Sequence, residues 1–182
     1  MVFGKTYTVT KIKEVEDVEH IDLGPLIRQA HQVFSPNTSL GEWIEEGEAK
    51  YGKNFTDIIL CKQIERLTKR QDSEITIITG SRSLPGIQYI ANRFGIRYPQ
   101  IIYITAPFLQ LKRNYEGREG ISLTEEEFLS ILQAEKQMGL EQLEQYAREH
   151  CVYLRNDNTD GFIQTIRNIM IKKKEKEEKT KG

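Results

Sequence analysis

Arginines that shortly follow β-branched segments are the residues of this chain best suited to chemistry. Arg28, Arg82 and Arg113 each come a few residues after such a segment. A guanidinium group offers a planar fork of N–H donors that matches the oxygens of a phosphate. Parallel sheets bind ligands beyond the carboxyl ends of their strands, so arginines placed there predict a site for a polyanionic ligand. The alternative is that each arginine is a solvated loop charge.

A second chemical signal is Gly4-Lys5-Thr6, which has the form of the end of a phosphate-binding loop, G-x-x-x-x-G-K-[ST]. In that loop, backbone N–H groups and a helix N-terminus hold the phosphates of a nucleotide. The lysine reaches the β- and γ-phosphate oxygens, and the hydroxyl binds Mg²⁺. The sequence contains the second half of this motif, so the tripeptide alone is a weak indication.

The elements that must position these residues alternate between short β-branched segments and longer stretches of helical period. This alternation is typical of a parallel sheet covered by helices. We expect strands over residues 18–21, 75–79, 101–105 and 151–154. Apolar residues at helical spacing predict helices over 23–34, 55–67, 84–94 and 162–170. Two more are expected over 124–138 and 140–148, with a break near Gly139 and a capping box at Thr124.

Composition excludes several classes of function. The 182 residues include 26 basic and 27 acidic side chains, which gives a formal net charge of −1. Such a balance provides no general attraction for nucleic-acid phosphates or anionic lipid, so we expect neither as a partner. No apolar run has the length of a membrane span or a signal peptide. We therefore expect a soluble, cytoplasmic protein in which Cys61 and Cys151 are structural thiols.

Length and charge pattern also indicate the domain organisation. The chain is long enough for one domain with a sizeable core, which we expect over residues 1–171. Residues 172–182 carry lysines and glutamates and no apolar side chain. This tail cannot offset the entropy cost of ordering by burial, so we expect a frayed helix end or a disordered segment.

In the order and spacing of its motifs, the chain resembles the adenylate-kinase-like branch of P-loop nucleoside and nucleotide kinases. Within that branch it is most similar to the dephospho-CoA-kinase-like proteins. The matching segments are Gly4-Lys5-Thr6, His20 to Arg28, Leu40 to Gly52, Gly80 to Ser83, Pro107 to Arg118, Glu127-Phe128, Glu135, Gly139-Leu140 and Asn156-Asp157. The resemblance covers nearly all of the chain except the tail. It implies a three-layer α/β/α fold of the P-loop NTPase type, with a mainly parallel sheet and a small helical lid at about residues 113–124.

The resemblance also implies which residues bind the phosphoryl donor. Gly4, Lys5 and Thr6 would contact the phosphates of ATP, and the Thr6 hydroxyl would bind Mg²⁺. Asn156 and Asn158 would lie beside the nucleotide base.

For the phosphoryl acceptor, the resemblance implies that Arg28 and Arg82 hold the anionic part of that molecule. Arg113 and Arg118 would lie on or near the lid and neutralise charge during transfer. Asp22 is a candidate to orient the acceptor or a metal ion, by its position only.

Two departures from the family pattern affect these expectations. Relatives often carry an acid at the end of the second core strand, where this chain has Thr79. The family's strand before the phosphate loop, an interior strand of the sheet, has no counterpart in the sequence. Either the chain is a fragment of a longer protein and residues 6–15 form the helix after the loop, or residues 5–13 fill the gap as a strand. The spacing favours the helix.

We therefore expect an ATP- and Mg²⁺-dependent kinase whose partner is a small phosphate-bearing molecule. The acceptor would be nucleotide-like or a CoA precursor. The alternative is a truncated or degenerate relative that binds an anion without catalysis, which the incomplete loop and Thr79 favour.

Overall fold

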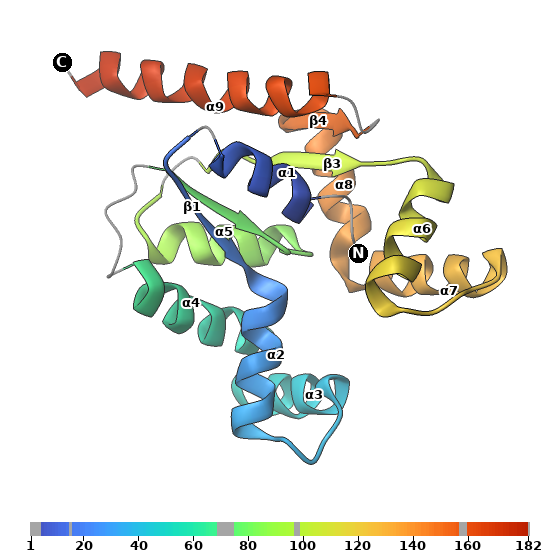
Figure 1. Ribbon diagram of the computed structural model, residues 1–182. Coiled ribbons are helices and arrows are strands. Elements are labelled where there is room, and N and C mark those ends of the chain that lie inside the picture. The colour runs from blue at the N-terminus through green and yellow to red at the C-terminus, as the bar shows by residue number, and fades with distance from the viewer. Residues whose placement is uncertain (1–4, 15, 69–74, 97–98, 157–159, 182) are drawn as a thin grey trace.

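Four short strands lie at the centre of the computed structural model, which describes residues 5–14, 16–68, 75–96, 99–156 and 160–181 (Figure 1). Strand β1 (Val18–Asp22) pairs in parallel with β2 (Ile75–Thr79). Strand β3 (Ile102–Thr105) pairs in parallel with β4 (Val152–Arg155). All four strands lie within one residue of the predicted segments, so the β-branched runs identified them correctly.

The mixed α/β class is confirmed, but the strands of the described residues do not form one sheet. They form two separate two-stranded parallel sheets, and no hydrogen-bond ladder joins β2 to β3. The described residues therefore do not show the single, mainly parallel sheet that the sequence predicts. The physical reason is that no described strand lies between β2 and β3 to connect their backbone groups.

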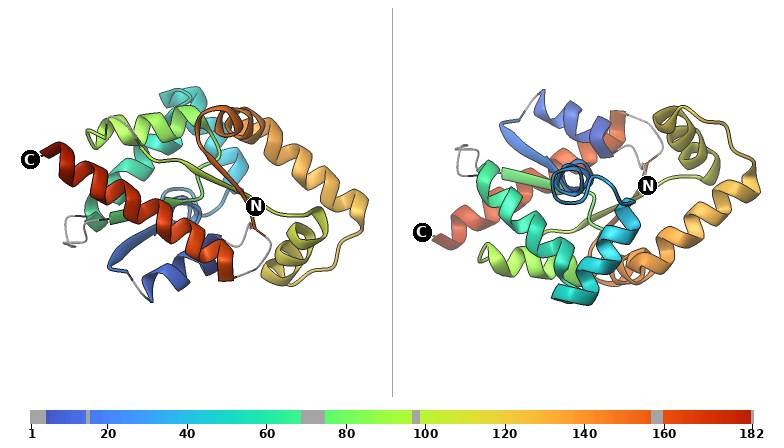
Figure 2. Two further views of the ribbon diagram at one scale, coloured as in Figure 1. Left: turned by 90° about the horizontal axis from the view of Figure 1, so that it is seen from above. Right: turned by 90° about the horizontal axis from the view of Figure 1, so that it is seen from below.

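Helices α1 (Lys5–Lys13) and α9 (Asp160–Lys181) cover one face of both strand pairs. Their buried side chains, Ile12, Phe162 and Ile166, pack together with Val18 in one apolar cluster. Partly buried residues from β2, β3 and β4 join this cluster, among them Ile75, Ile77, Ile102, Ile104 and Leu154. Seen from above, α9 lies across the strands (Figure 2).

The N-terminal segment is a helix, and the strand alternative for residues 5–13 is wrong. Thr8, Val9 and Ile12 are all buried. This spacing places them on one face of a helix, where they meet β1 and β2. The burial of that face outweighs the β-propensity of the threonines and valine, because packing decides when local propensities are weak.

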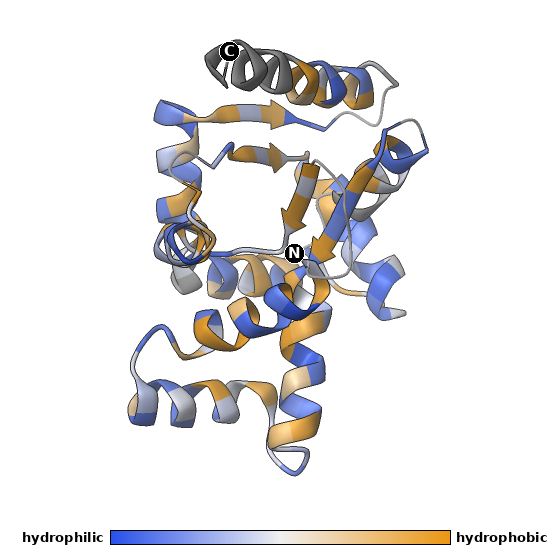
Figure 3. Ribbon diagram, turned by 90° about the vertical axis from the view of Figure 1, so that its left-hand side faces the viewer, coloured by the Kyte–Doolittle hydropathy of each residue, from blue (hydrophilic) through white to orange (hydrophobic). Residues whose placement is uncertain are grey.

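Three helices cover the opposite face of the strands: α4 (Phe55–Thr68), α5 (Leu84–Arg93) and α8 (Glu141–His150). Helix α5 takes part in two apolar clusters. Its Ile90 packs with Ile21 and with residues of α4, while its Leu84 and Ile87 pack with Tyr103 and α8. Figure 3 shows the strands as largely hydrophobic, as expected for strands that helices cover on both sides.

Two further helices extend beyond the strands. Helix α2 (Leu23–Phe34) follows β1 directly, and α3 (Leu40–Tyr51) packs against α2 and α4. Trp43 of α3 lies at the centre of this contact, with its ring centroid 5.5 Å from that of His31 and 5.1 Å from that of Phe55. Helices α2 and α3 form the lowest part of the molecule in Figure 1.

Helices α6 (Phe108–Glu119) and α7 (Glu125–Glu135) form a hairpin, called the α6–α7 hairpin below. Its core is Phe128, which is 1% exposed and contacts the rings of Phe108 and Tyr115. The capping box predicted at Thr124 is present, with Glu127 accepting the Thr124 backbone N–H at 2.7 Å. The segment expected to be a lid, about 113–124, corresponds to the second half of α6 and the connecting loop.

The predicted break between the last two helices of this region is also present. A wide helical turn over Lys136–Leu140 joins α7 to α8, and within it Gly139 has a φ of 101°. A side chain is strained in this left-handed region, so glycine suits the position.

At the C-terminal end, the backbone of residues 172–181 continues α9 instead of being irregular. Of the two forms expected for the charged tail, the structure takes the helical one. In the described part of the chain, no helix combines the length and the apolar character that crossing a membrane requires.

Candidate functional site

The carboxyl ends of β1 and β2 form the edge from which the site is built. Asp22, the last residue of β1, caps α2 because its Oδ1 accepts the Gly24 backbone N–H at 3.2 Å. Gly80 follows β2 and has a φ of 95°. A β-carbon at Gly80 would lie 3.0 Å from Asp22 Oδ1 and 3.3 Å from the Gly24 nitrogen. The turn after β2 therefore passes directly against the first turn of α2, and only a glycine fits there.

Arg28 reaches this edge from the second turn of α2. It lies four residues after Gly24 and so on the same helix face. A β-carbon built on Gly24 would lie 3.6 Å from Arg28 Nη2 and 3.6 Å from Asp22 Oδ1. The guanidinium group and the carboxylate therefore approach the same point from two sides. Gly24 leaves the space that allows this.

Arg82 lies at the same edge, in the turn between β2 and α5. Its Nη2 is 3.2 Å from Glu135 Oε1, and 47% of its side chain remains exposed. Ser83 ends the turn and caps α5 by accepting the Gly86 backbone N–H at 3.1 Å. The structure thus brings two of the predicted phosphate-binding arginines, Arg28 and Arg82, to the carboxyl ends of one strand pair.

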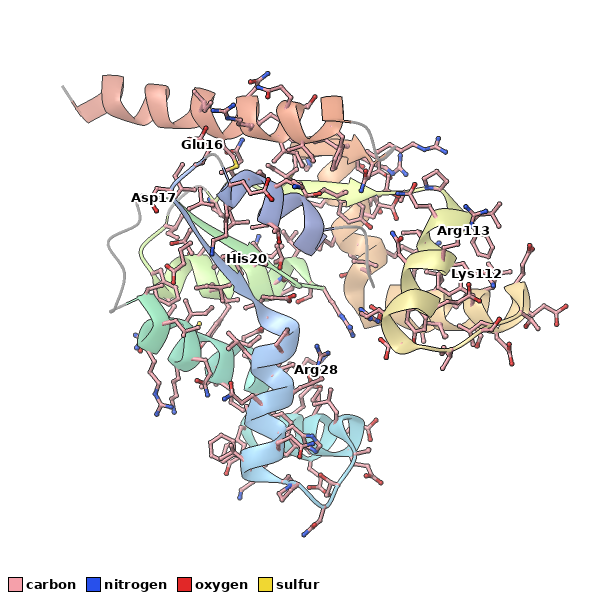
Figure 4. The ribbon with its side chains drawn as sticks, viewed as in Figure 1. Glu16, Asp17, His20, Arg28, Lys112 and Arg113 are labelled. Atoms are coloured by element: carbon pink, nitrogen blue, oxygen red, sulfur yellow. The ribbon has the colours of Figure 1, made fainter. Side chains whose placement is uncertain are left out.

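The other two arginines lie on the α6–α7 hairpin. Arg113 is exposed on α6, and Figure 4 shows it at the right of the view, while Arg28 lies on α2 near the lower centre. Arg118 is in the last turn of α6, where it pairs with Glu119 and lies 5.1 Å from the centre of the Tyr115 ring.

Only some of the residues predicted to bind the donor nucleotide belong to the described part of the chain. Gly4 and Asn158 lie outside it. Lys5 and Thr6 form the first turn of α1, which carries no acidic residue. Because α1 leads into the amino end of β1, its own first turn faces the carboxyl ends of the strands (Figure 1). Asn156 is buried just after β4, and its backbone N–H donates to the Thr105 carbonyl at 2.7 Å.

Thr79, which stands where relatives of the resembled family often have an acid, is joined to His20. His20 Nε2 and Thr79 Oγ1 are 2.9 Å apart across β1 and β2. Burial lowers the pKa of His20, against the opposing effect of the Asp22 charge. The Thr79 hydroxyl therefore contacts a neutral imidazole on the neighbouring strand, and this contact helps to join β1 and β2.

This pair gives a prediction about pH. The unfolded chain should bind a proton at His20 near the ordinary value of 6.5, while the folded protein resists protonation until a lower pH. The free energy of unfolding should therefore fall as pH drops below that value, and level off once the folded His20 is protonated. Urea titrations of the wild type and of His20→Asn between pH 7.5 and 5 would measure this, with the exposed His150→Asn as the control. An equal pH dependence in all three proteins would contradict it.

Metal binding at this edge would depend on few protein ligands. Among the described residues, no group of three or more His, Cys, Asp or Glu side chains is arranged to hold a metal ion. Mg²⁺ in phosphoryl-transfer sites commonly uses one or two carboxylates together with substrate phosphates and water. Asp22 at the end of β1 could supply one such carboxylate.

A pocket of about 370 Å³ lies elsewhere, at the amino ends of β3 and β4. Ile101 and Val152 line it, with Ile87 from α5 and Tyr146 from α8. No arginine or lysine is among its lining residues, and it is at the opposite end of the strands from the ends where the arginine-bearing turns begin. We therefore assign the candidate site to the edge around Asp22 and Gly80.

Sequence reasoning did not identify the partner of Arg82. Glu135 lies 53 positions further along the chain and matched the family pattern without a role. A signal was present, because Phe128, Leu132 and Glu135 share one helical face, and an acid on an inward face requires a partner. Glu135 is 9% exposed, which agrees with that face being the inward one.

No protein-family model matches this chain, and no curated protein matches it. The function must therefore be argued from the site itself.

Proposed function

We propose that this fold binds a phosphate-bearing small molecule beyond β1 and β2 and serves ATP- and Mg²⁺-dependent phosphoryl transfer. The acceptor is nucleotide-like or a precursor of CoA. The observation that carries the proposal is the placement of Arg28 and Arg82 at one strand edge, around the contact of Gly80 with Asp22. Two guanidinium forks at one edge suit an anion with several oxygens better than a single carboxylate.

The acceptor side follows from the distribution of charge. Arg28 keeps its guanidinium at the first turn of α2, and Arg82 contributes a second one from the next crossover turn. Arg82 contacts Glu135 through Nη2, and 47% of its side chain is exposed, so an anion can approach it from solvent.

The donor side follows from the orientation of α1. The first turn of a helix presents backbone N–H groups and the positive end of the helix dipole, both of which favour phosphate. No acidic residue in this turn of α1 competes for those groups. Lys5 and Thr6 would bind the ATP phosphates, and Mg²⁺ would be held by Thr6, by the phosphates and by Asp22. Mg²⁺ bound there supplies neutralising charge for the phosphates.

Catalysis in such a site consists of positioning and of charge stabilisation. Phosphoryl transfer requires the attacking and leaving oxygens to be nearly in line, with negative charge spread over the transferring group. Arg28 and Arg82 would hold the acceptor for in-line attack. Arg113 and Arg118 on the α6–α7 hairpin would balance charge on the transferring group if the hairpin closes over the edge.

The space between the two strand pairs supports a finer proposal about the fold. Apolar clusters on both faces of the strands unite residues of both pairs or share helix α5. A fifth strand between β2 and β3 would be covered on both faces, would satisfy the inner backbone groups of both strands, and would complete a three-layer α/β/α fold of P-loop type.

A second candidate function is a binding module that keeps the anion site without catalysis. The observation that favours it is the His20–Thr79 pair. In this pair, the Thr79 hydroxyl already contacts His20 on the neighbouring strand. It stands at the position where an acid would help to hold a metal ion. For either candidate, a cytoplasmic location suits two free thiols and a need for ATP.

The test measures binding and transfer separately. Calorimetry would record binding of AMP, UMP, CMP, GMP and dephospho-CoA to the chain. Transfer from γ-labelled ATP with Mg²⁺ would be assayed for the chain and for a version extended by an apolar strand that completes the phosphate loop. Transfer to one acceptor supports the kinase, and binding without transfer in both versions supports the binding module. Absence of binding for every phosphate ester would overturn both.

Arg28 gives the corresponding prediction for a single side chain. Arg28→Met should weaken acceptor binding about 10- to 150-fold, because a hydrogen bond to a charged group contributes about 1.5–3 kcal/mol. Calorimetry with the best-binding phosphate ester measures this. Arg66→Met, an exposed arginine in the last turn of α4, is the matched control and should leave affinity unchanged. Equal affinities for the two variants would show that Arg28 does not contact the acceptor.

A further inference from the structure

We infer that Glu135 is a positioning residue, which holds the guanidinium group of Arg82 toward the acceptor anion and links the acceptor site to the α6–α7 hairpin. This inference rests on the proposed function and deepens it. Glu135 lies on α7, whereas Arg28 lies on α2 and Arg82 in the turn between β2 and α5. The inference is that the contact with Glu135 fixes the orientation of the Arg82 side chain.

The first observation is the unequal burial of the two partners. Glu135 Oε1 lies 3.2 Å from Arg82 Nη2, and the exposed fractions of the side chains are 11% for Glu135 and 47% for Arg82. The carboxylate is therefore confined, while the guanidinium extends into solvent. A confined carboxylate restricts the rotamers of a long arginine side chain, which is otherwise free to adopt many orientations.

The second observation is that the same segment also holds the backbone of the turn. Gly139, four residues after Glu135, lies against the β2–α5 turn. A β-carbon at Gly139 would lie 3.3 Å from Ser83 Cβ and 3.4 Å from the Arg82 carbonyl oxygen. The chain around residues 135–139 thus contacts Arg82 at its side chain and at its backbone. Both contacts fix where the guanidinium group lies.

The third observation concerns the geometry of the ion pair. The contact joins Glu135 Oε1 to Nη2, a terminal nitrogen of the Arg82 guanidinium group. Arginine carries five N–H donors in a rigid fork, so a contact at one terminal nitrogen orients the whole group, and 47% of the Arg82 side chain is exposed to an approaching anion. Orientation by a neighbouring carboxylate is a recognised way in which a second residue improves a binding group.

The position of Glu135 at the end of α7 adds a consequence for the hairpin. Glu135 is the last residue of α7, and α7 packs through Phe128 on α6, which carries Arg113 and Arg118. The Arg82–Glu135 pair is therefore a direct contact between the acceptor-binding turn and the hairpin. An anion that binds to Arg82 therefore binds to a side chain that is in contact with the last residue of α7.

The experiment compares Glu135→Gln, Glu135→Asp and the control Glu126→Gln, which changes an exposed acid in the first turn of the same helix. Calorimetry with AMP and dephospho-CoA gives the dissociation constants without requiring turnover. We expect Glu135→Gln to weaken binding about 10-fold, the lower end of the loss seen when an outer-shell group that orients a metal ligand is removed. Glu135→Asp should recover part of that loss, and Glu126→Gln should match the wild type. Where transfer is measurable, Glu135→Gln should raise KM for the acceptor more than it lowers kcat.

A double-mutant cycle separates positioning from a structural role. In an Arg82→Lys background, Glu135→Gln should have little further effect on affinity, because both changes act through one guanidinium group. Additive losses would overturn the inference, as would unchanged or tighter binding by Glu135→Gln. In those cases a weakened Arg28→Met and Arg82→Lys would leave the proposed function standing. If no phosphate ester binds the wild type, the proposed function fails and this inference fails with it.

Discussion

Replacing Lys5 by methionine should lower the rate of phosphoryl transfer from ATP by about 100- to 1,000-fold, the usual cost of removing one group that stabilises transition-state charge. Lys5 lies in the first turn of α1, the helix whose start faces the carboxyl ends of the strands. Methionine keeps the length and apolar character of the side chain and removes only its charge. Acceptor binding should be unchanged, because Arg28 and Arg82 remain.

Lys11→Met is the matched control for this experiment. Lys11 lies in the last turn of the same helix and forms an ion pair with Glu14 at 2.8 Å, with both side chains substantially exposed. Exposed pairs of this kind contribute little to stability. The control should therefore keep the full transfer rate in the chain with a completed phosphate loop. If Lys5→Met and Lys11→Met transferred phosphate equally well, Lys5 would have no role in the donor site.

The largest effect on stability is expected for Phe128→Ala in the α6–α7 hairpin. Phe128 is 1% exposed and packs on Ala106, Leu111 and the rings of Phe108 and Tyr115. Removing a buried phenyl ring from such a cluster costs about 3–5 kcal/mol in the free energy of unfolding. Urea unfolding followed by circular dichroism would measure the change.

Leu129→Ala is the control for this experiment. It truncates an apolar side chain of the same helix that is not buried, so any general effect of such a truncation on the helix can be subtracted. Leu129 is 46% exposed on the same helix, and its replacement should change the free energy of unfolding by about 0.5 kcal/mol or less. Similar values for both variants would mean that the hairpin is not organised around Phe128. Because Glu135 ends the same helix, Phe128→Ala should also weaken acceptor binding at temperatures where the fold survives.

The strands were predictable because each combines β-branched residues with flanking polar turns. Ile75 to Thr79 and the segment at Ile102 are strands in the structure within one residue of the prediction. The N-terminal segment was harder, since its alternating threonines suit a strand while Val9 and Ile12 suit a helix. Burial of one helical face decided between them, and burial depends on what lies opposite in three dimensions.

The site was predictable only where it is local in sequence. Asp22, Arg28 and Arg82 follow strands directly, so topology alone brings them to a strand edge. The Arg82–Glu135 contact joins residues from distant parts of the chain, and no local pattern reveals which arginine an inward-facing acid will meet. The separation of the four strands into two pairs was not predictable either, because strand propensity does not report which edges become neighbours.

Helix α5 has a consequence for the molecule as a whole. It contributes Ile90 to the apolar cluster beneath β1, and Leu84 and Ile87 to the cluster beneath β3. Neither half can come apart without exposing one side of this helix to water. Although the halves share no backbone ladder, the shared helix leads us to expect that they unfold together in one transition.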